Sequence, residues 1–222
     1  NTTGEGNVAV GNTALDASTT GDYNVALGDG SLSSNTTASS NTAVGQASLQ
    51  NNTTGATNVA VGRNALQLNT TAANNTAVGY AALGVNTTGH SNTAVGKDAL
   101  LANTEGFHNV AIGLSAMDAM TTGDYNAALG GGALGSDTTG AGSTAIGYAA
   151  LTAQNSTSSA DMFNTAVGRE AMVANTTGTP NTAVGALALD ANTTAGNNTA
   201  VGYAALGANT TANNNTAVGH SA

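Results

Sequence analysis

Apolar and polar residues follow one another along this chain in a unit that returns every seventeen residues. The consensus of the unit is N-[TV]-A-[VIL]-G-x-x-[AS]-[LM]-x-x-N-T-T-[GA]-x-x, and its positions are numbered below as columns 1 to 17. The unit begins at Asn7, Asn24, Asn41, Asn58, Asn75, Asn92, Asn109, Asn126, Ser143, Asn164, Asn181, Asn198 and Asn215. A fixed period of this size indicates a repeat architecture in which each unit forms one coil.

The period is too short for a helical repeat, since a pair of helices needs roughly 33 residues or more. In columns 1 to 5 the side chains at 2 and 4 point to one side of a strand, and those at 3 and 5 to the other. Apolar columns 8 and 9 predict a second short strand, and N-T-T-G at columns 12 to 15 predicts a turn. We therefore expect an all-β fold, a parallel β-solenoid (β-roll or β-helix) of about thirteen 17-residue rungs.

Stacking places identical residues in ladders about 4.8 Å apart. We expect columns 4 and 9 to supply the apolar core. The two core ladders contain Val44, Val61, Val78 and Val95, and Leu49, Leu66, Leu83 and Leu100. Ala at column 3 and Gly at column 5 then leave a face that is too small to cover anything unless another backbone lies close against it.

The size of this core favours lateral association. Burying a Val or Leu side chain contributes about 1.5–3 kcal/mol, whereas ordering each backbone residue costs roughly 1–2 kcal/mol. Two such side chains in each coil do not stabilise an isolated coil, so further burial is needed. We expect the Ala/Gly faces of three chains to meet in a homotrimer, with a thin coil whose two sheets touch as the alternative.

The repeat array covers residues 1–222 as a single domain, with one interruption. The interval from Ser143 to Asn164 is four residues longer than the others, which predicts a loop insertion within 154–163. Met162 and Phe163 are the bulky apolar residues of this insertion and its best candidates for contact with a neighbouring molecule. No capping sequence is visible at either end, which suggests an excerpt of a longer array or a subunit that stacks axially.

Composition excludes several classes of function. Only 7% of the residues are charged and 3% are aromatic, so any core is narrow. Three basic residues in a chain of net charge −9 provide no track for a phosphate backbone, so we expect no nucleic-acid binding. The absence of cysteine excludes disulfides and thiolate metal sites, and no apolar run is long enough for membrane insertion.

The run NTAVGYAALGVNTTGHSNTAVGKDAL from Asn75 resembles the repeats of phage-type tail-fibre proteins and related bacterial surface proteins. Its N-T-A-V-G core is also similar to the N-S-V-A-I-G repeat of trimeric autotransporter adhesin heads. The similarity extends from Asn7 to Ala222. The adhesin-head family implies a left-handed parallel β-roll, three chains around one axis and a role in attachment. This sequence differs from that family in its longer coil, because the NTTG turn adds residues.

The N-T-T triplets are acceptor sequences for N-linked glycans at an expected exposed turn. The candidates for glycosylation are Asn35, Asn52, Asn69, Asn86, Asn175, Asn192 and Asn209, together with Asn155 in the insertion. Further acceptors with the sequence N-N-T occur at Asn51, Asn74, Asn197 and Asn214. The alternative is purely structural, since Asn adopts left-handed turn conformations and Thr favours strands.

Two other kinds of activity have candidate residues in this sequence. Thr53, Thr70 and Thr87 would stack beside Thr54, Thr71 and Thr88 and could order water as an ice-binding array. The histidines at 90, 108 and 220 occupy different columns and have no repeated nucleophile or carboxylate partner. We therefore expect no enzyme, no catalytic or metal site and no cofactor.

These patterns predict a structural extracellular fibre or adhesin-like rod for attachment or surface display, on a cell surface or as a virion appendage. One alternative is a self-stacking filament subunit coated with glycans. An alternative of another class is an ice- or carbohydrate-binding module. The expected partners are further copies of the same chain and a surface receptor or glycan.

Overall fold

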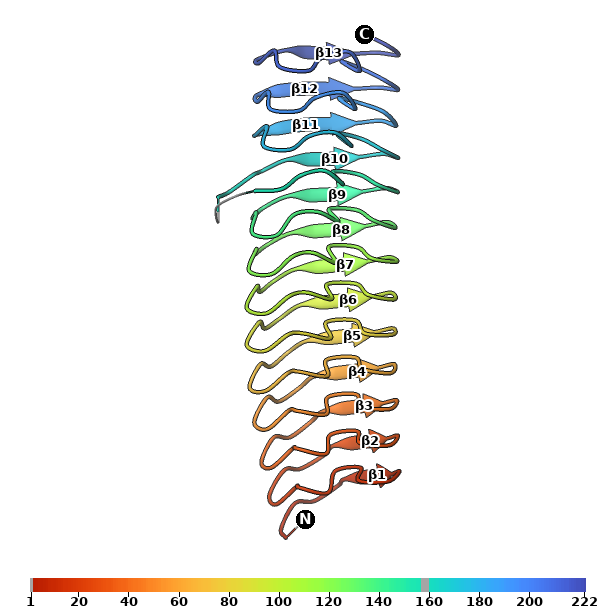
Figure 1. The fold of residues 1–222 in the computed structure, drawn as a ribbon, viewed down its shortest axis with the longest axis vertical. Helices are drawn as coiled ribbons and strands as arrows, with labels where there is room; N and C mark the ends of the chain where they lie inside the picture. Colours follow the sequence, from red (N-terminus) through yellow and green to blue (C-terminus); the bar gives the residue numbers. More distant parts are fainter. Residues whose placement is uncertain (1, 157–159) are drawn as a thin grey trace. The chain divides into compact units, whose positions relative to one another are not determined.

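The computed structural model describes residues 2–156 and 160–222, and it is an all-β parallel β-solenoid with one short strand in each coil (Figure 1). No helix occurs among the described residues. The expected fold class and the seventeen-residue rung are confirmed, since paired strands join residues seventeen positions apart in each regular coil. Lateral association into a homotrimer stays a prediction.

The chain divides into two compact units, Asn1–His108 and Asn109–Ala222, within the repeat array. The strands of unit 1 pair in chain order and are β1 (Val8–Val10), β2 (Val25–Leu27), β3 (Thr42–Val44), β4 (Val59–Val61), β5 (Thr76–Val78) and β6 (Thr93–Val95). Those of unit 2 do the same and are β7 (Val110–Ile112), β8 (Ala127–Leu129), β9 (Thr144–Ile146), β10 (Thr165–Val167), β11 (Asn181–Val184), β12 (Asn198–Val201) and β13 (Thr216–Val218).

The strands face the core with their small residues. Ala60 and Ala77 of column 3 are fully buried, whereas Val61 of column 4 is 36% exposed. The predicted Val core ladder is therefore wrong: Val44, Val61, Val78 and Val95 all lie on the outside of their coils, half-buried or exposed. Leu49, Leu66, Leu83 and Leu100 are fully buried and point into the coil from the other side.

The narrow coil explains this orientation. The Leu side chain of column 9 fills the interior, so the strand opposite has room only for Ala. The same side of the strand also carries Asn at column 1, which is buried in most coils and binds the turn. Because side chains alternate along a strand, the larger residues of columns 2 and 4 must face outward.

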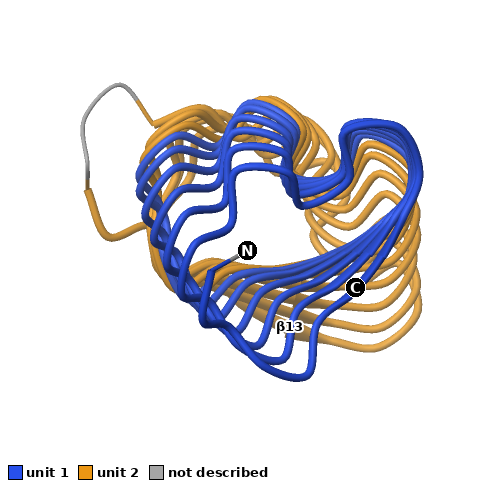
Figure 2. Cartoon of the chain, turned by 90° about the horizontal axis from the view of Figure 1, so that it is seen from below, with its two compact units in different colours: residues 1–108 blue, residues 109–222 orange. Residues whose placement is uncertain are grey.

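Columns 6 to 11 form turns, and the second strand predicted at columns 8 and 9 is absent from the described coils. Residues at columns 7 and 9 have left-handed backbone angles, such as Ala47 (φ 56°) and Leu49 (φ 49°). Their N–H groups point in opposite directions along the stack, to Asp29 O at 2.9 Å and to Ala65 O at 3.0 Å respectively. Figure 2 views the chain along the axis on which the coils stack, and it shows that each coil bends inward on the side away from its strand.

Column 5 requires glycine because adjacent coils touch there. Gly79 has φ 137°, and a Cβ atom on it would lie 2.4 Å from Gly96 O. The sequence pattern predicted a close backbone at this column and attributed it to a partner chain. In the structure, the close backbone belongs to the next coil of the same chain.

The insertion folds partly back onto unit 2. Met162 is buried, and its N–H donates to Ala141 O at 2.8 Å, so this residue is not available to a neighbouring molecule as had been expected. Phe163 is 59% exposed and its ring lies against Gly142. Residues 157–159 of the insertion lie outside the described residues.

Replacing Gly79 with Ala is expected to lower the free energy of unfolding by about 2 kcal/mol or more, because the Cβ clashes with the next coil and φ is unfavourable. Gly131→Ala is the control, since its nearest neighbour is a Tyr148 ring atom 3.7 Å away. Chemical denaturation followed by circular dichroism measures both. Equal stability of the two variants would contradict the close approach at column 5.

Candidate functional site

The first repeated polar group is the Asn ladder of column 1. Asn58 is fully buried, and its side-chain Nδ2 donates to Ala72 O at 2.9 Å, which ties the strand to the turn of the same coil. Its backbone N–H donates to Asn41 Oδ1 at 2.9 Å, which ties it to the preceding coil. Each amide therefore acts as donor within one coil and as acceptor between coils.

The second ladder is formed by Asn of column 12, and it meets the first at a shared carbonyl. Asn69 Nδ2 donates to Ala72 O at 3.0 Å and to Asn52 Oδ1 at 2.8 Å. The carbonyl of Ala72 thus accepts from Asn58 and Asn69 together. Two amides close the turn of each such coil, and the amides of column 12 also join consecutive coils.

A longer side chain compensates where these ladders change residue type in unit 2. Gln154 takes the place of Asn at column 12, and its Nε2 donates to Asp137 Oδ2 at 2.6 Å and to Ser143 Oγ at 3.1 Å. Its Oε1 accepts from Asn164 Nδ2 at 2.8 Å. All four side chains belong to buried residues, so Gln154 keeps both ladders hydrogen-bonded next to the insertion.

The buried ladder contradicts most of the predicted glycosylation sites in the folded chain. A glycan replaces a hydrogen on Nδ2 and needs an opening to solvent, but six of the candidates are completely buried with Nδ2 already bonded. These are Asn35, Asn52, Asn69, Asn86, Asn175 and Asn192. Asn209, in the last coil, is partly exposed, but its Nδ2 makes the same two kinds of bond.

The accessible acceptor sequences lie elsewhere in the repeat. Asn155 is exposed, although Thr157, the third residue of its acceptor sequence, lies outside the described residues. The N-N-T acceptors are exposed at Asn51 in column 11 and at Asn74, Asn197 and Asn214 in column 17. The triplet alone does not separate buried from exposed asparagines, and only the column number does.

The two Thr columns of the N-T-T turn, columns 13 and 14, differ in their hydrogen bonding and exposure. Thr53 and Thr70 of column 13 each donate their hydroxyl to the carbonyl one coil further on, Thr53 to Thr70 O at 3.0 Å and Thr70 to Thr87 O at 3.3 Å. Thr54 and Thr71 of column 14 are exposed. The proposed ice-binding array therefore presents one row of exposed Thr residues, because the other row is used to join the coils.

A different surface is flat and regular: the outer face, defined as columns 2 and 4 of the strands. Its exposed large residues in unit 1 are Val8, Val10, Leu27, Val59 and Val61, and in unit 2 Val110, Ile112, Leu129, Ile146, Val184, Val201 and Val218. Thr occupies column 2 in the remaining strands apart from β2 and β8, which carry Val25 and Ala127. Sequence reasoning missed this face because it assigned column 4 to the core.

Adjacent coils bring together two histidines, His90 and His108, although they occupy different columns. His90 stacks on Phe107 with ring centroids 5.1 Å apart, and His108 meets His90 edge-on at 5.6 Å. His220 stacks on Tyr203 at 5.0 Å. Among the residues that the structure describes, no group of three or more His, Cys, Asp or Glu side chains is placed to hold a metal ion.

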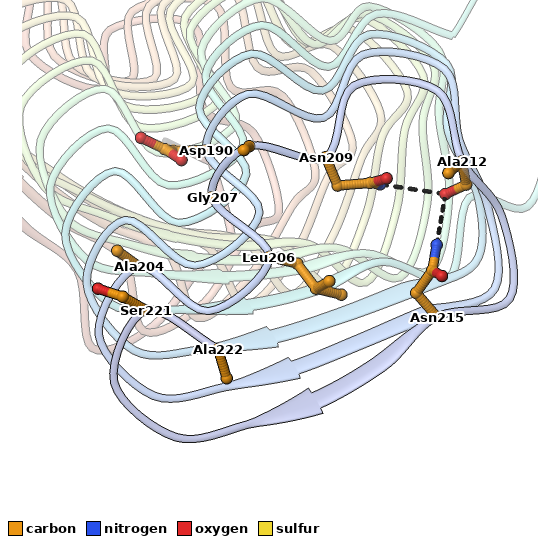
Figure 3. A pocket seen from close by; sticks show the side chains of 10 residues that line it. Asp190, Ala204, Leu206, Gly207, Asn209, Ala212, Asn215, Ser221 and Ala222 are labelled. Carbon is orange, nitrogen blue, oxygen red and sulfur yellow. Dashed lines mark hydrogen bonds between the residues drawn. The ribbon is translucent and has the colours of Figure 1, made fainter.

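A hollow of about 680 Å³ lies at the last coil of unit 2 (Figure 3). Leu206 and Ala222 line it, and Asn209 and Asn215 both donate to Ala212 O at 3.1 Å beside it. The same columns form the buried interior in earlier coils, so this hollow is the solenoid core seen in cross-section. A second hollow, of about 290 Å³, lies on the surface between Leu114 and Tyr148.

Comparison with known proteins returned no match to any family model, curated protein or solved structure. No helix able to span a membrane occurs within residues 2–156 and 160–222.

Replacing Asn69 with Ala is expected to lower the free energy of unfolding by about 1–3 kcal/mol, because Asn52 Oδ1 loses its donor and Asn86 Nδ2 an acceptor. The matched control is Asn51→Ala, an exposed position one column away, which should change stability by no more than about 0.5 kcal/mol. Denaturant titration compares the two. If Asn51→Ala were the more damaging, the ladder would not be the stabilising element.

In a host that attaches N-linked glycans, folded material is expected to carry them at Asn51, Asn74, Asn197 or Asn214 and not at Asn52 or the other buried positions of column 12. Mass spectrometry of peptides after enzymatic release of the glycans in heavy-oxygen water identifies the modified asparagines. Occupancy at a buried column-12 position in folded protein would contradict the burial of that amide.

Proposed function

We propose that this chain is a structural element, a rod or fibre segment that acts through its length and its repeated surface. The observation that carries the proposal is the identity of the connections within each unit. Each regular coil is joined to the next by backbone hydrogen bonds in the same register and by the same Asn amides. Coils can therefore be added without changing the cross-section, which is the property that a fibre needs.

The variable columns support a role in attachment or surface display. Column 6 carries Arg63, Tyr80 and Lys97 in three consecutive coils, whereas column 3 carries Ala in all three. Arg63, Tyr80 and Lys97 are exposed, so the surface changes from rung to rung over a constant interior. This arrangement suits a rod that presents different contacts along its length to a receptor or glycan.

An extracellular location, on a cell surface or a virion appendage, is part of the same proposal. The chain contains no cysteine and its exposed polar residues are mostly Asn, Thr and Ser. The likeness of its N-T-A-V-G motif to tail-fibre and adhesin-head repeats points in the same direction. Self-association, both lateral and axial, completes the proposed fibre.

Electron cryo-microscopy of the purified chain tests the rod. We expect elongated particles of uniform width, with a repeat of about 4.8 Å along the long axis from the stacked strands. Compact particles without this repeat would overturn the proposal. Attachment is tested separately, by binding of the labelled chain to candidate cell surfaces.

A further inference from the structure

The outer face of each unit carries no charge: column 4 is apolar in every strand, and column 2 is Val, Ala or Thr. The three basic and twelve acidic residues of the chain all lie outside columns 1 to 5. Val59 and Val61 on β4 are each 36% exposed, and Val184 and Val201 on β11 and β12 are 38% and 36% exposed. Water thus contacts rows of β-branched side chains that run along the stack.

The Thr residues of the outer face differ from those of column 13 in the N-T-T turn. In column 2, none of the Thr side chains makes a hydrogen bond to the part of the chain that the structure describes, and all are at least partly exposed. They are Thr42, Thr76, Thr93, Thr144, Thr165, Thr182, Thr199 and Thr216. Their hydroxyl groups do not contribute to joining the coils, in contrast to those of column 13.

We propose that the outer face is a contact surface for the outer face of a second copy of this chain. The proposal rests on the proposed fibre and names the surface through which its rods associate side by side. The lateral contact expected from the sequence involved the Ala/Gly side of the strand, which is buried inside the coil. We place this contact at columns 2 and 4 instead.

The charge distribution favours association of two copies through their outer faces rather than through any other face. Copies with a net charge of −9 repel each other, and the repulsion is smallest where no charged group is present. A strongly charged partner would find no complementary group on the outer face. Two outer faces, in contrast, bury apolar surface without desolvating any ion.

The periodicity of the face is matched only by another array of the same spacing. Parallel in-register strands about 4.8 Å apart allow identical side chains of two sheets to interdigitate in a dry interface, with the sheets about 10 Å apart. A two-fold axis along the strand direction places column 2 opposite column 2 and column 4 opposite column 4. Each Thr hydroxyl then faces the column that supplies other hydroxyl groups, which lowers the cost of burying it. Rods paired in this way run antiparallel.

The size of the face sets the expected affinity. In the six strands of unit 1 and the seven of unit 2, columns 2 to 4 cover on the order of 300 Å² per unit, from the strand spacing and the rise per residue. A standard stable interface buries about 800 Å² per partner, so one unit alone pairs weakly and pairing strengthens as more rungs engage. The association is therefore expected to depend on protein concentration.

Sedimentation equilibrium of the whole chain over a concentration series tests this. The variant Val184→Lys/Val201→Lys places two charges on the outer face, and Thr177→Lys/Thr194→Lys adds the same charges at exposed column 14 in consecutive coils. We expect wild type and the column-14 variant to associate, and the outer-face variant to associate at least tenfold more weakly. Circular dichroism confirms that all three are folded.

Three results would overturn the inference: a wild type that stays monomeric up to millimolar concentration, equal association by both variants, or equal loss in both. Thermal hysteresis that only the outer-face variant loses, in a monomeric wild type, would assign the face to ice instead. None of these results would contradict the proposed rod. Electron cryo-microscopy of the outer-face variant tests that separately, by showing whether single rods persist.

Discussion

Each side chain of a solenoid coil must tolerate its own equivalent about 4.8 Å away in the next coil. This requirement therefore favours residues that pack against, or hydrogen-bond with, an identical residue. Asn satisfies it inside the coil because its amide carries both a donor and an acceptor, so Asn52, Asn69 and Asn86 bind one another in series. A buried row of identical charges would repel itself, and every charged residue except Asp137 is at least partly exposed.

The same requirement explains how so thin a coil is stable without large side chains. Small residues at columns 3 and 8 let the Leu of column 9 reach across the interior, and the coil closes on itself by the two amides at the column-15 carbonyl. Burial and hydrogen bonding are thus shared among many small groups in each coil. The expected homotrimer rested on two buried side chains per coil and did not include these groups.

Much of the fold was predictable from the sequence, because a seventeen-residue period with glycine at column 5 excludes helices. Which side of the strand faces inward was not predictable from hydrophobicity, since Val61 is more apolar than Ala60 but lies outside. A better signal was present in the chain: column 3 is Ala in every repeat, whereas columns 2 and 4 vary. Constancy among the repeats marks the interior, where residues are packed on all sides.

The turn conformation and the candidate sites could not be predicted from the sequence, for a different reason. Leu is disfavoured at positive φ, so nothing in the repeat predicts that Leu49 adopts φ 49°. The turn persists because the N–H of Leu49 bonds to the following coil and that of Ala47 to the preceding coil, and these bonds exist only once the coils are stacked. Acceptor triplets such as that of Asn52 likewise describe local chemistry, while burial is decided by residues seventeen positions away.

The amide ladders also bear on how this protein ages. Asparagine loses its amide when the backbone nitrogen of the following residue attacks the side-chain carbonyl carbon. After Asn58 that nitrogen, of Val59, is held by Asn75 O at 2.8 Å, and the leaving group is itself bound by Ala72 O. Stacking therefore protects these buried amides from the reaction that would remove the donors closing each coil.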